Sequence, residues 1–566
     1  MQKVLNCGIL AAIAVCCSIL PAAWAEELHV PAEYATIQSA IDAAQPGDEV
    51  VIAPGTYTGA GNKNLDFWGK AITVRSTDPE DPAVVAATVI DCEDSGIGFW
   101  FVSGEGPDSV LAGLKITNGH GDAGGAVACY ESSPTFINCV FWLNVAIEGG
   151  GLFCYYASPT LIGCTIAGNE CHHATGYANG GGVACYWDCD LVLTNCNVYC
   201  NGVSGAYAQG GGFYAVGRGS LALTDCIISC NTASATEFAS GGGLRCDTQH
   251  NLVLTNCAVD ANLAYSSQGA EGGGLFAIRA SATLINCRID SNAVSAPNGH
   301  GGGVCAEERG SIALANCTIT ENNATTYGGG VYCFLLADVT MASCSVTGNV
   351  VGDFGGSVCC RHATSLTATA CTISGDLVTR GLWLACYSGS DRAPSTVSIA
   401  NCILWNDGDA ILRYDDSAIN IRHSNISGGW TGVGNINEDP LFVDPENGDF
   451  HLTGDSPCID AGDPAFVPEP SARDMDGEYR LWDGDGDGTA MIDMGADEFG
   501  SHVFGDLNCD GQVDNFDISP FILALTNPQG YAATYPGCSR ELADINSDGS
   551  VDNFDIRPFL QLLTGD

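Results

Sequence analysis

The sequence predicts an all-β fold, a parallel β-helix (solenoid) over residues 26–499, followed by a small α-helical module over residues 504–566. Three observations predict it. A self-similar unit of 25 to 32 residues recurs between about residues 124 and 407, a cysteine marks each unit, and an asparagine and a glycine triplet follow that cysteine at regular distances. A fixed period of this length is the signature of a stacked repeat architecture.

The marker cysteine follows a β-branched, apolar run, as in Leu254-Thr255-Asn256-Cys257. The markers are Cys139, Cys164, Cys196, Cys226, Cys257, Cys287, Cys317, Cys344, Cys371 and Cys402. Eight consecutive units carry an asparagine five positions later: Asn144, Asn169, Asn201, Asn231, Asn262, Asn292, Asn322 and Asn349. Short strands without a helical period favour β coils over helices.

Stacking such coils places equivalent residues about 4.8 Å apart on neighbouring rungs. The marker cysteines then fill a tight interior as small apolar side chains. The asparagines are expected at bends, with hydrogen bonds along the stack and left-handed dihedral angles. The glycines permit backbone conformations closed to other residues. We expect most thiols to stay free, with Cys200 and Cys230, on neighbouring coils, as one candidate disulfide pair.

The N-terminus has the pattern of an export signal. Lys3 supplies a positive charge, residues 9–20 form an apolar run, and Ala23-Trp24-Ala25 fits a cleavage site. Residues 1–25 are therefore predicted to be a signal peptide, and the protein is expected to be secreted, either extracellular or on the cell surface. The apolar run is too short for a membrane span, and no later segment resembles one.

The formal net charge of −47 bears on possible partners. Nucleic acid is excluded, because its phosphates would be repelled by such a surface. An acidic surface is typical of a soluble exported protein, and many of its carboxylates suit cation binding.

The beginning of the solenoid resembles a known family. Residues 37–44 read as a short helix with one apolar face, and Pro46-Gly47-Asp48 and Pro54-Gly55-Thr56-Tyr57 follow as turns. These motifs resemble the opening of pectate-lyase-like right-handed parallel β-helix proteins. The resemblance implies a right-handed β-helix closed by an N-terminal cap helix. It leaves function open, because that family contains polysaccharide-cleaving enzymes and non-catalytic surface proteins.

Two twelve-residue loops in the C-terminal module predict bound Ca²⁺. Both place oxygen-bearing side chains at loop positions 1, 3, 5, 9 and 12, and both have glycine at position 6. The predicted ligands of the first loop are Asp506, Asn508, Asp510, Gln512, Asp514 and Asp517. Those of the second loop are Asp544, Asn546, Asp548, Ser550, Asp552 and Asp555.

The duplicated loops resemble type I dockerins, modules that bind cohesin domains. The resemblance implies partner recognition by loop positions 10 and 11, which are Asn515, Phe516, Asn553 and Phe554. The sequence departs from that family in three ways. Phenylalanine replaces the usual small hydroxyl residue, Pro520 and Pro558 are expected to interrupt the helices, and the spacer between the loops is long. Cys509 and Cys538 are expected to pair.

Candidate residues for polysaccharide chemistry come from the scarce arginines. Arg218, Arg279 and Arg309 each lie eight residues before a marker cysteine, so we expect them at one turn of the solenoid. Arg279 and Arg309 are the candidate catalytic residues. Arg218, with Glu307 and Glu308, is a candidate for binding the substrate. Solvated turn residues are the alternative.

Two functional hypotheses therefore remain. The first is a secreted, calcium-dependent protein that acts on a polysaccharide, with pectate-lyase-like cleavage of a uronate polymer and a module for anchoring or assembly on a cohesin-like or cell-surface partner. The second is a non-catalytic adhesive or glycan-binding solenoid. The sequence leaves open whether the protein is an enzyme, and whether it would be a lyase or a glycoside hydrolase.

Overall fold

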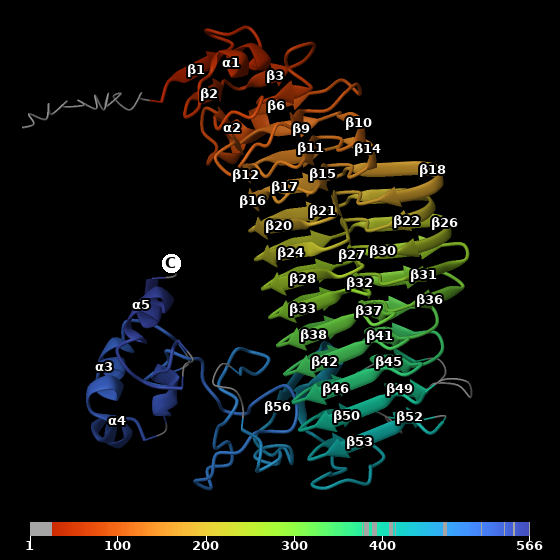
Figure 1. Ribbon diagram of the computed structural model, residues 1–566. Helices are drawn as coiled ribbons and strands as arrows, with labels where there is room; N and C mark the ends of the chain where they lie inside the picture. The colour runs from red at the N-terminus through yellow and green to blue at the C-terminus, as the bar shows by residue number, and fades with distance from the viewer. Residues whose placement is uncertain are drawn as a thin grey trace, which may run out of the picture.

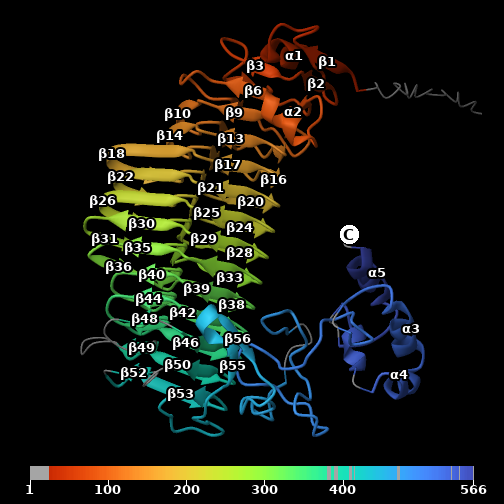
Figure 2. The same ribbon diagram turned by 180° about the vertical axis from the view of Figure 1, so that it is seen from behind.

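The computed structural model describes residues 25–375, 377–378, 384–387, 393–406, 411–413, 415–467, 472–510, 512–536, 538–546 and 549–564. All but the last residue of the predicted signal peptide lies outside these residues. Figure 1 shows a long stack of β coils with a short helix at the N-terminal end and a small helical module beside the stack. Figure 2 shows the opposite side of the same stack.

Four long sheets run along the stack, and within the described residues all strand pairs in them are parallel. Sheet A extends from β1 (Glu27–Val30) to β53 (Ala418–Arg422), and sheet B from β3 (Gly55–Tyr57) to β54 (Asn425–Ile426). Sheet C extends from β4 (Leu65–Asp66) to β52 (Ile411–Arg413), and sheet D from β10 (His120–Ala123) to β48 (Leu377–Val378). The predicted parallel β-helix is confirmed.

One coil shows how the repeat builds this stack. Its strands are β28 (His250–Thr255) in sheet A, β29 (Ala258–Asp260) in sheet B, β30 (Leu263–Ser266) and β31 (Gly269–Glu271) in sheet D, and β32 (Leu275–Ile278) in sheet C. Cys257, Asn262 and Gly272 lie in the three bends between these sheets. A fourth bend, from sheet C to the next strand of sheet A, carries Arg279.

The marker cysteines form a buried ladder between sheets A and B. The Cys164 side chain accepts a hydrogen bond from the backbone N–H of Cys139 at 3.4 Å, and Cys196 accepts one from Cys164 at 3.3 Å. Each marker thiol also donates to a backbone carbonyl two residues earlier, as Cys257 does to Thr255 at 3.2 Å. A thiol therefore fills the interior and gives a bend N–H a partner.

The asparagine ladder is fully buried between sheets B and D. The side-chain amide of Asn231 donates to the side-chain oxygen of Asn262 at 3.0 Å, and Asn262 donates to Asn292 at 2.9 Å. The expected left-handed dihedral angle falls instead on the residue before each asparagine, such as Ala261 with φ 52°. The left-handed residue turns the backbone directly before the asparagine, so that the asparagine side-chain amide can point along the stack.

The glycine triplets allow the coils to pack closely where sheet D leads into sheet C. Gly241 has φ 62°, a conformation that glycine adopts without strain. A Cβ atom on Gly242 would lie 2.5 Å from the carbonyl oxygen of Gly273 on the next coil. The triplet therefore has no room for side chains.

The N-terminal cap is helix α1 (Ile37–Ala43), which begins after the N-cap residue Thr36. Ile37, Ile41 and Ala44 are fully buried, as the sequence predicts. The helix covers the open apolar end of the first coils, which a solenoid needs at both ends.

Sheet D doubles back over the outside of sheet C. Its longest strands, β18 (Glu170–Asn179), β22 (Gly202–Gln209) and β26 (Thr232–Ser240), leave the coil and return to it around a small alanine-rich core. The returning part contacts the outer face of sheet C, where Asn179 donates a hydrogen bond to the Tyr186 hydroxyl at 2.8 Å.

The C-terminal end of the solenoid is closed by an irregular segment up to residue 499. It contains an antiparallel hairpin of β55 (Phe442–Asp444) and β56 (Asp449–Leu452). Leu452, Cys458 and Met494 form a separate core with Ile403 of strand β51 (Ile403–Trp405) in sheet B. This segment therefore packs on the outside of the stack and covers its last coils.

The C-terminal module contains α3 (Ile518–Thr526), α4 (Pro528–Thr534) and α5 (Ile556–Thr564). Phe521 and Phe559 stack at 4.1 Å between ring centroids, and a disulfide joins Cys509 to Cys538, as expected. The expectation that Pro520 and Pro558 interrupt the helices is wrong. Both lie in the first turn of their helix, where the backbone N–H has no intrahelical acceptor to lose. No helix in the described part of the chain is long and apolar enough to cross a membrane.

Candidate functional site

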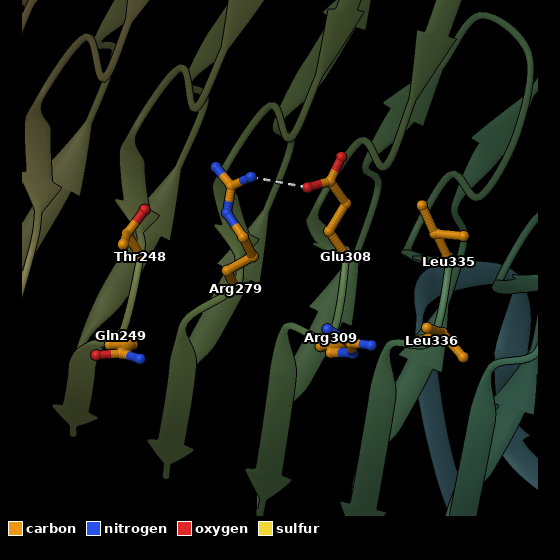
Figure 3. A pocket seen from close by; sticks show the side chains of 7 residues that line it. All are labelled: Thr248, Gln249, Arg279, Glu308, Arg309, Leu335 and Leu336. Carbon is orange, nitrogen blue, oxygen red and sulfur yellow. Dashed lines mark hydrogen bonds and ion pairs between the residues drawn. The ribbon is translucent and has the colours of Figure 1, made fainter.

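A groove of about 510 Å³ lies along the bends that lead from sheet C to sheet A. Four successive coils contribute to it, as Figure 3 shows. Its lining residues are Thr248, Gln249, Arg279, Glu308, Arg309, Leu335 and Leu336. We call it the turn groove. It brings together three of the five residues that the sequence predicts for polysaccharide chemistry.

Ion pairs hold Arg279 in place within the turn groove. Its guanidinium lies 3.0 Å from Asp247 Oδ1 and 2.9 Å from Glu308 Oε2. Asp247 also pairs with the buried Arg245 at 2.9 Å. Burial alone would raise the pKa of Asp247, but Arg245 and hydrogen bonds from Thr248 and Arg279 hold it below its usual value. The hydrogen bond to Asp247 in turn raises the pKa of Arg279.

The three arginines do not form the expected stack. The bend that carries Arg279 is one residue shorter than the bend of the next coil. The backbone N–H of Arg279 donates to the backbone carbonyl of Glu307. Arg279 therefore aligns with Glu308, and opposite charges alternate along the groove. Arg309 aligns with Leu336 (Figure 3) and forms no ion pair among the described residues. Arg218 is exposed two coils before Arg279 and does not line the groove.

Glu307 is buried on the outer face of β37 (Val304–Glu307), directly before Glu308. Its carboxyl group forms a hydrogen bond with that of Glu271, on the returning part of sheet D. Burial, followed by repulsion from Glu271, raises the pKa of Glu307 to about 10. The His300 imidazole lies 3.5 Å from the Glu271 carboxylate. Burial and the neighbouring Glu271 carboxylate therefore favour the protonated form of Glu307, which lies beside the turn groove.

One outward column of sheet C leads along the stack to these residues. Its members, paired in register on successive coils, are Tyr130, Tyr155, Tyr186, Val216, Asp247, Ile278, Glu307, Phe334 and Arg361. We call it the outer column. The Tyr130 and Tyr155 rings are 6.0 Å apart, and both are partly exposed. Aromatic faces of this kind suit contact with sugar rings.

Sequence reasoning missed Arg245, Asp247 and Glu271. Arg245 and Asp247 alternate with the interior residues Leu244 and Cys246 along β27 (Leu244–Asp247), and so face outward. The signal in the sequence that could have found Arg245 and Asp247 is a charged residue at both outward positions of one strand. Glu271 directly precedes a glycine triplet, and nothing in that position alone indicates that sheet D folds back over sheet C.

The two predicted calcium loops share one hydrogen-bonding pattern. In the first, the buried Asp517 carboxylate accepts backbone N–H groups of Asn508 and Asp514 at 3.0 and 2.9 Å. In the second, the buried Asp555 accepts those of Asn546 and Asp552 at 3.1 and 2.8 Å.

The first carboxylate of each loop, Asp506 or Asp544, is buried as well. Asp548 lies outside the described residues. Paired buried carboxylates with further oxygen side chains around them fit a hard divalent cation.

The predicted partner-binding residues of the module face solvent. Phe516 is 74% exposed and Phe554 is 75% exposed, and Asn515 and Asn553 beside them are exposed as well. Both phenylalanines directly precede the closing aspartate of their loop. The module therefore presents two equivalent aromatic sites, one from each loop.

Three of the solved structures that match this chain have low identity to it. Pectate lyase Pel9A is 14% identical, with 82% of this chain and 90% of that chain covered and a TM-score of 0.28. A mannuronic acid specific polysaccharide family 6 lyase from human gut microbiota is 13% identical, with 73% and 92% covered and a TM-score of 0.33. The receptor binding domain of the Siphovirus 9NA tailspike is 10% identical, with 75% and 81% covered and a TM-score of 0.28.

No curated protein matches the sequence. Residues 96–277 and 273–444 match the family model described as the right handed beta helix region. These two matches together span more than half of the chain and the full run of marker cysteines. The chain therefore belongs to the right-handed β-helix family.

Proposed function

We propose that the protein binds an acidic polysaccharide along the outer column and the turn groove, and cleaves it beside Glu307. The observation that carries the proposal is the position of a buried carboxyl group, with a pKa raised by that burial, next to a groove that contains guanidinium groups. Arginine suits the recognition of carboxylates, because its planar group donates two parallel hydrogen bonds. A uronate polymer offers one carboxylate on each sugar.

The arginines divide into two roles in this proposal. Arg309 and Arg218 lack ion-pair partners among the described residues, so they are available to an anionic ligand. Arg309 and Arg218 lie three coils apart, which corresponds to roughly 14 Å at 4.8 Å per coil. Arg279 is the weaker candidate for a catalytic base, because its pKa is raised rather than lowered. We assign it to holding the substrate.

Glu307 is the proposed proton donor. Cleavage of a glycosidic bond, by hydrolysis or by β-elimination, leaves a sugar oxygen that needs a proton. A carboxyl group with a pKa of about 10 keeps its proton at neutral pH and can deliver it where charge develops. Glu307 is only 7% exposed, so the substrate has to displace part of the returning strand of sheet D.

Calcium and export complete the proposal. Ca²⁺ would bind to the two loops through the ligands named from the sequence, and would hold the fold of the module in place. The export signal would place the protein outside the cell, and Phe516 and Phe554 would contact a cohesin-like or cell-surface partner that anchors it there. The support for anchoring is the exposure of two equivalent aromatic side chains on one module.

A non-catalytic glycan-binding solenoid is the second candidate. The pairing of Arg279 with both Asp247 and Glu308 favours it, because these contacts neutralise the groove's central cation. In that case the protein would bind the same polymer and release no fragments.

Binding is tested by affinity electrophoresis in gels that contain polygalacturonate, alginate or a neutral glucan. We expect two variants, Arg309→Gln and Arg218→Gln, each to weaken retention by polyuronates about tenfold. Their migration in the gel with the neutral glucan should equal that of the parent protein. The matched control is Arg288→Gln, a partly exposed arginine on sheet B. Equal retention of the three variants and the parent protein would contradict the proposed binding face.

A further inference from the structure

The closing segment brings three distant parts of the chain to one point beside the last coils. His451 lies on β56, Asp476 follows in a turn, and Asp497 lies near the end of the segment. Ligand atoms of the three side chains all lie within 4.8 Å of one another. His451 Nε2 is 2.7 Å from Asp476 Oδ2.

A further carboxylate fixes the orientation of this imidazole. Asp449, two residues before His451 on the same strand, forms a hydrogen bond with His451 Nδ1. Nε2 therefore points toward Asp476 and Asp497. A carboxylate that accepts the N–H of one ring nitrogen is the device that orients the other nitrogen of histidine ligands of metal ions.

The negative charge at this point exceeds the positive charge. Five carboxyl groups interact with one another or with His451: Asp449, Asp474, Asp476, Glu478 and Asp497. Within the described residues, His451 is the one cationic side chain in ion-pair contact with Asp476. The nearby Arg480 is directed elsewhere, since its guanidinium donates to the carbonyls of Ala496 and Gly495. Carboxylates at such short distances repel one another unless a cation lies between them.

Asp497 is the most buried of these three side chains. This side chain is only 6% exposed, and its Oδ2 accepts the Leu452 N–H at 2.7 Å. No hydrogen bond reaches its other oxygen from the described residues. This nearly buried carboxylate belongs to the group that converges on His451.

We propose that His451, Asp476 and Asp497 bind a divalent transition-metal ion that ties the hairpin β55–β56 to the rest of the closing segment. One imidazole nitrogen that has released its proton and two carboxylate oxygens suit Zn²⁺, Co²⁺ or Mn²⁺, whereas calcium prefers ligand sets made of oxygen alone. His451 and Asp476 are partly exposed, so water completes the coordination.

The site is separate from the calcium loops and from the turn groove. Its role is structural, because the three ligands come from parts of the chain that no repeat holds together. Metal binding would therefore stabilise the folded closing segment over its unfolded form.

Cobalt titration of the full-length protein, with saturating Ca²⁺ to fill the C-terminal loops, tests this site. We expect one equivalent of Co²⁺ to produce visible d–d absorption, and Zn²⁺ to abolish the absorption by competition. His451→Gln and Asp476→Asn should each lower Co²⁺ affinity at least about 100-fold, and Asp449→Asn by about 10- to 100-fold. His29→Gln, which replaces a partly exposed histidine at the other end of the solenoid, is the control and should leave the titration unchanged.

Thermal unfolding adds a readout that does not depend on colour. Zn²⁺ should raise the Tm of the parent protein and of His29→Gln, and leave the Tm of His451→Gln and Asp476→Asn unchanged. If one variant does not fold, the other still decides the test. Co²⁺ absorption that persists in the folded His451→Gln protein, or its absence from the parent protein, would overturn the assignment.

Discussion

Arg279 Nη2 lies 3.0 Å from Asp247 Oδ1 on the preceding coil, and Asp247 at the same time pairs with the buried Arg245 at 2.9 Å. The two arginines differ in exposure. Arg245 is 7% exposed as a residue, whereas half of the Arg279 side chain faces solvent. The same carboxylate therefore compensates a buried charge on one side and fixes a groove-lining charge on the other.

This difference predicts unequal costs for two substitutions. Asp247→Asn leaves the buried Arg245 without its counter-charge and should lower the free energy of unfolding by about 3–5 kcal/mol. Arg279→Gln removes an exposed partner and should cost less than about 1 kcal/mol. Thermal unfolding of both variants measures the difference, and a Tm loss in Arg279→Gln as large as in Asp247→Asn would contradict it.

Glu307 predicts a pH dependence of stability. Burial and Glu271 raise its pKa from 4.5 to about 10 in the folded protein, so between these values the folded chain holds a proton that the unfolded chain releases. The contribution of Glu307 to the free energy of unfolding is fully present below pH 4.5. It is lost as the pH rises through the pKa that Glu307 has in the folded protein. Glu307→Gln should flatten the decline in Tm between about pH 6 and pH 10, whereas Glu446→Gln, on the exposed surface, should not. Parallel Tm profiles for the parent protein and Glu307→Gln would refute the raised pKa.

Calcium removal should act on the C-terminal module alone. Calorimetric titration of the chelated protein is expected to show two Ca²⁺ sites in the loops, because each has buried carboxylates at both ends. Asp517→Asn should remove one of them, and Asp517→Asn combined with Asp555→Asn should remove both. Asp94→Asn, near the N-terminal end of the solenoid, is the control. Two loop sites that remain in the double variant would exclude the predicted ligands.

The thiols should divide sharply by reactivity. Among the free cysteines of the described residues, Cys200 and Cys230 are exposed and all others are buried. Backbone pairing places these two in register on neighbouring coils, within the Cα range of a disulfide. Maleimide should label at most two thiols in the folded protein, and prior treatment with oxidised glutathione should prevent both labels with a loss of about two mass units. Labelling of many more thiols under native conditions would show that the ladder is accessible.

The repeat could be predicted because every coil repeats the same packing problem. A residue that stacks on its own copies, such as Asn262 or Cys257, leaves a periodic trace in the sequence. The module could be predicted because its two loops repeat a spacing of oxygen-bearing residues.

The candidate site could be predicted only in part. Arg279, Glu308 and Arg309 do line one groove, but the shortened bend at Arg279 changes its alignment, and counting from the marker cysteine cannot detect it. Glu271 reaches Glu307 through a part of sheet D whose length differs between coils. His451 and Asp497 lie in a segment without a repeat, so only tertiary contacts bring them together.

Product mass spectrometry tests the central claim most directly. The mature protein is incubated with calcium and with polygalacturonate, alginate and a neutral glucan. The account predicts fragments from a polyuronate, none from the neutral glucan, and a rate at least about 100-fold lower for Glu307→Gln. Fragments lighter by one water than hydrolysis products would identify β-elimination, and water-added fragments would identify hydrolysis. No fragments from any polymer, with folded and calcium-loaded protein, would contradict cleavage and leave a glycan-binding solenoid.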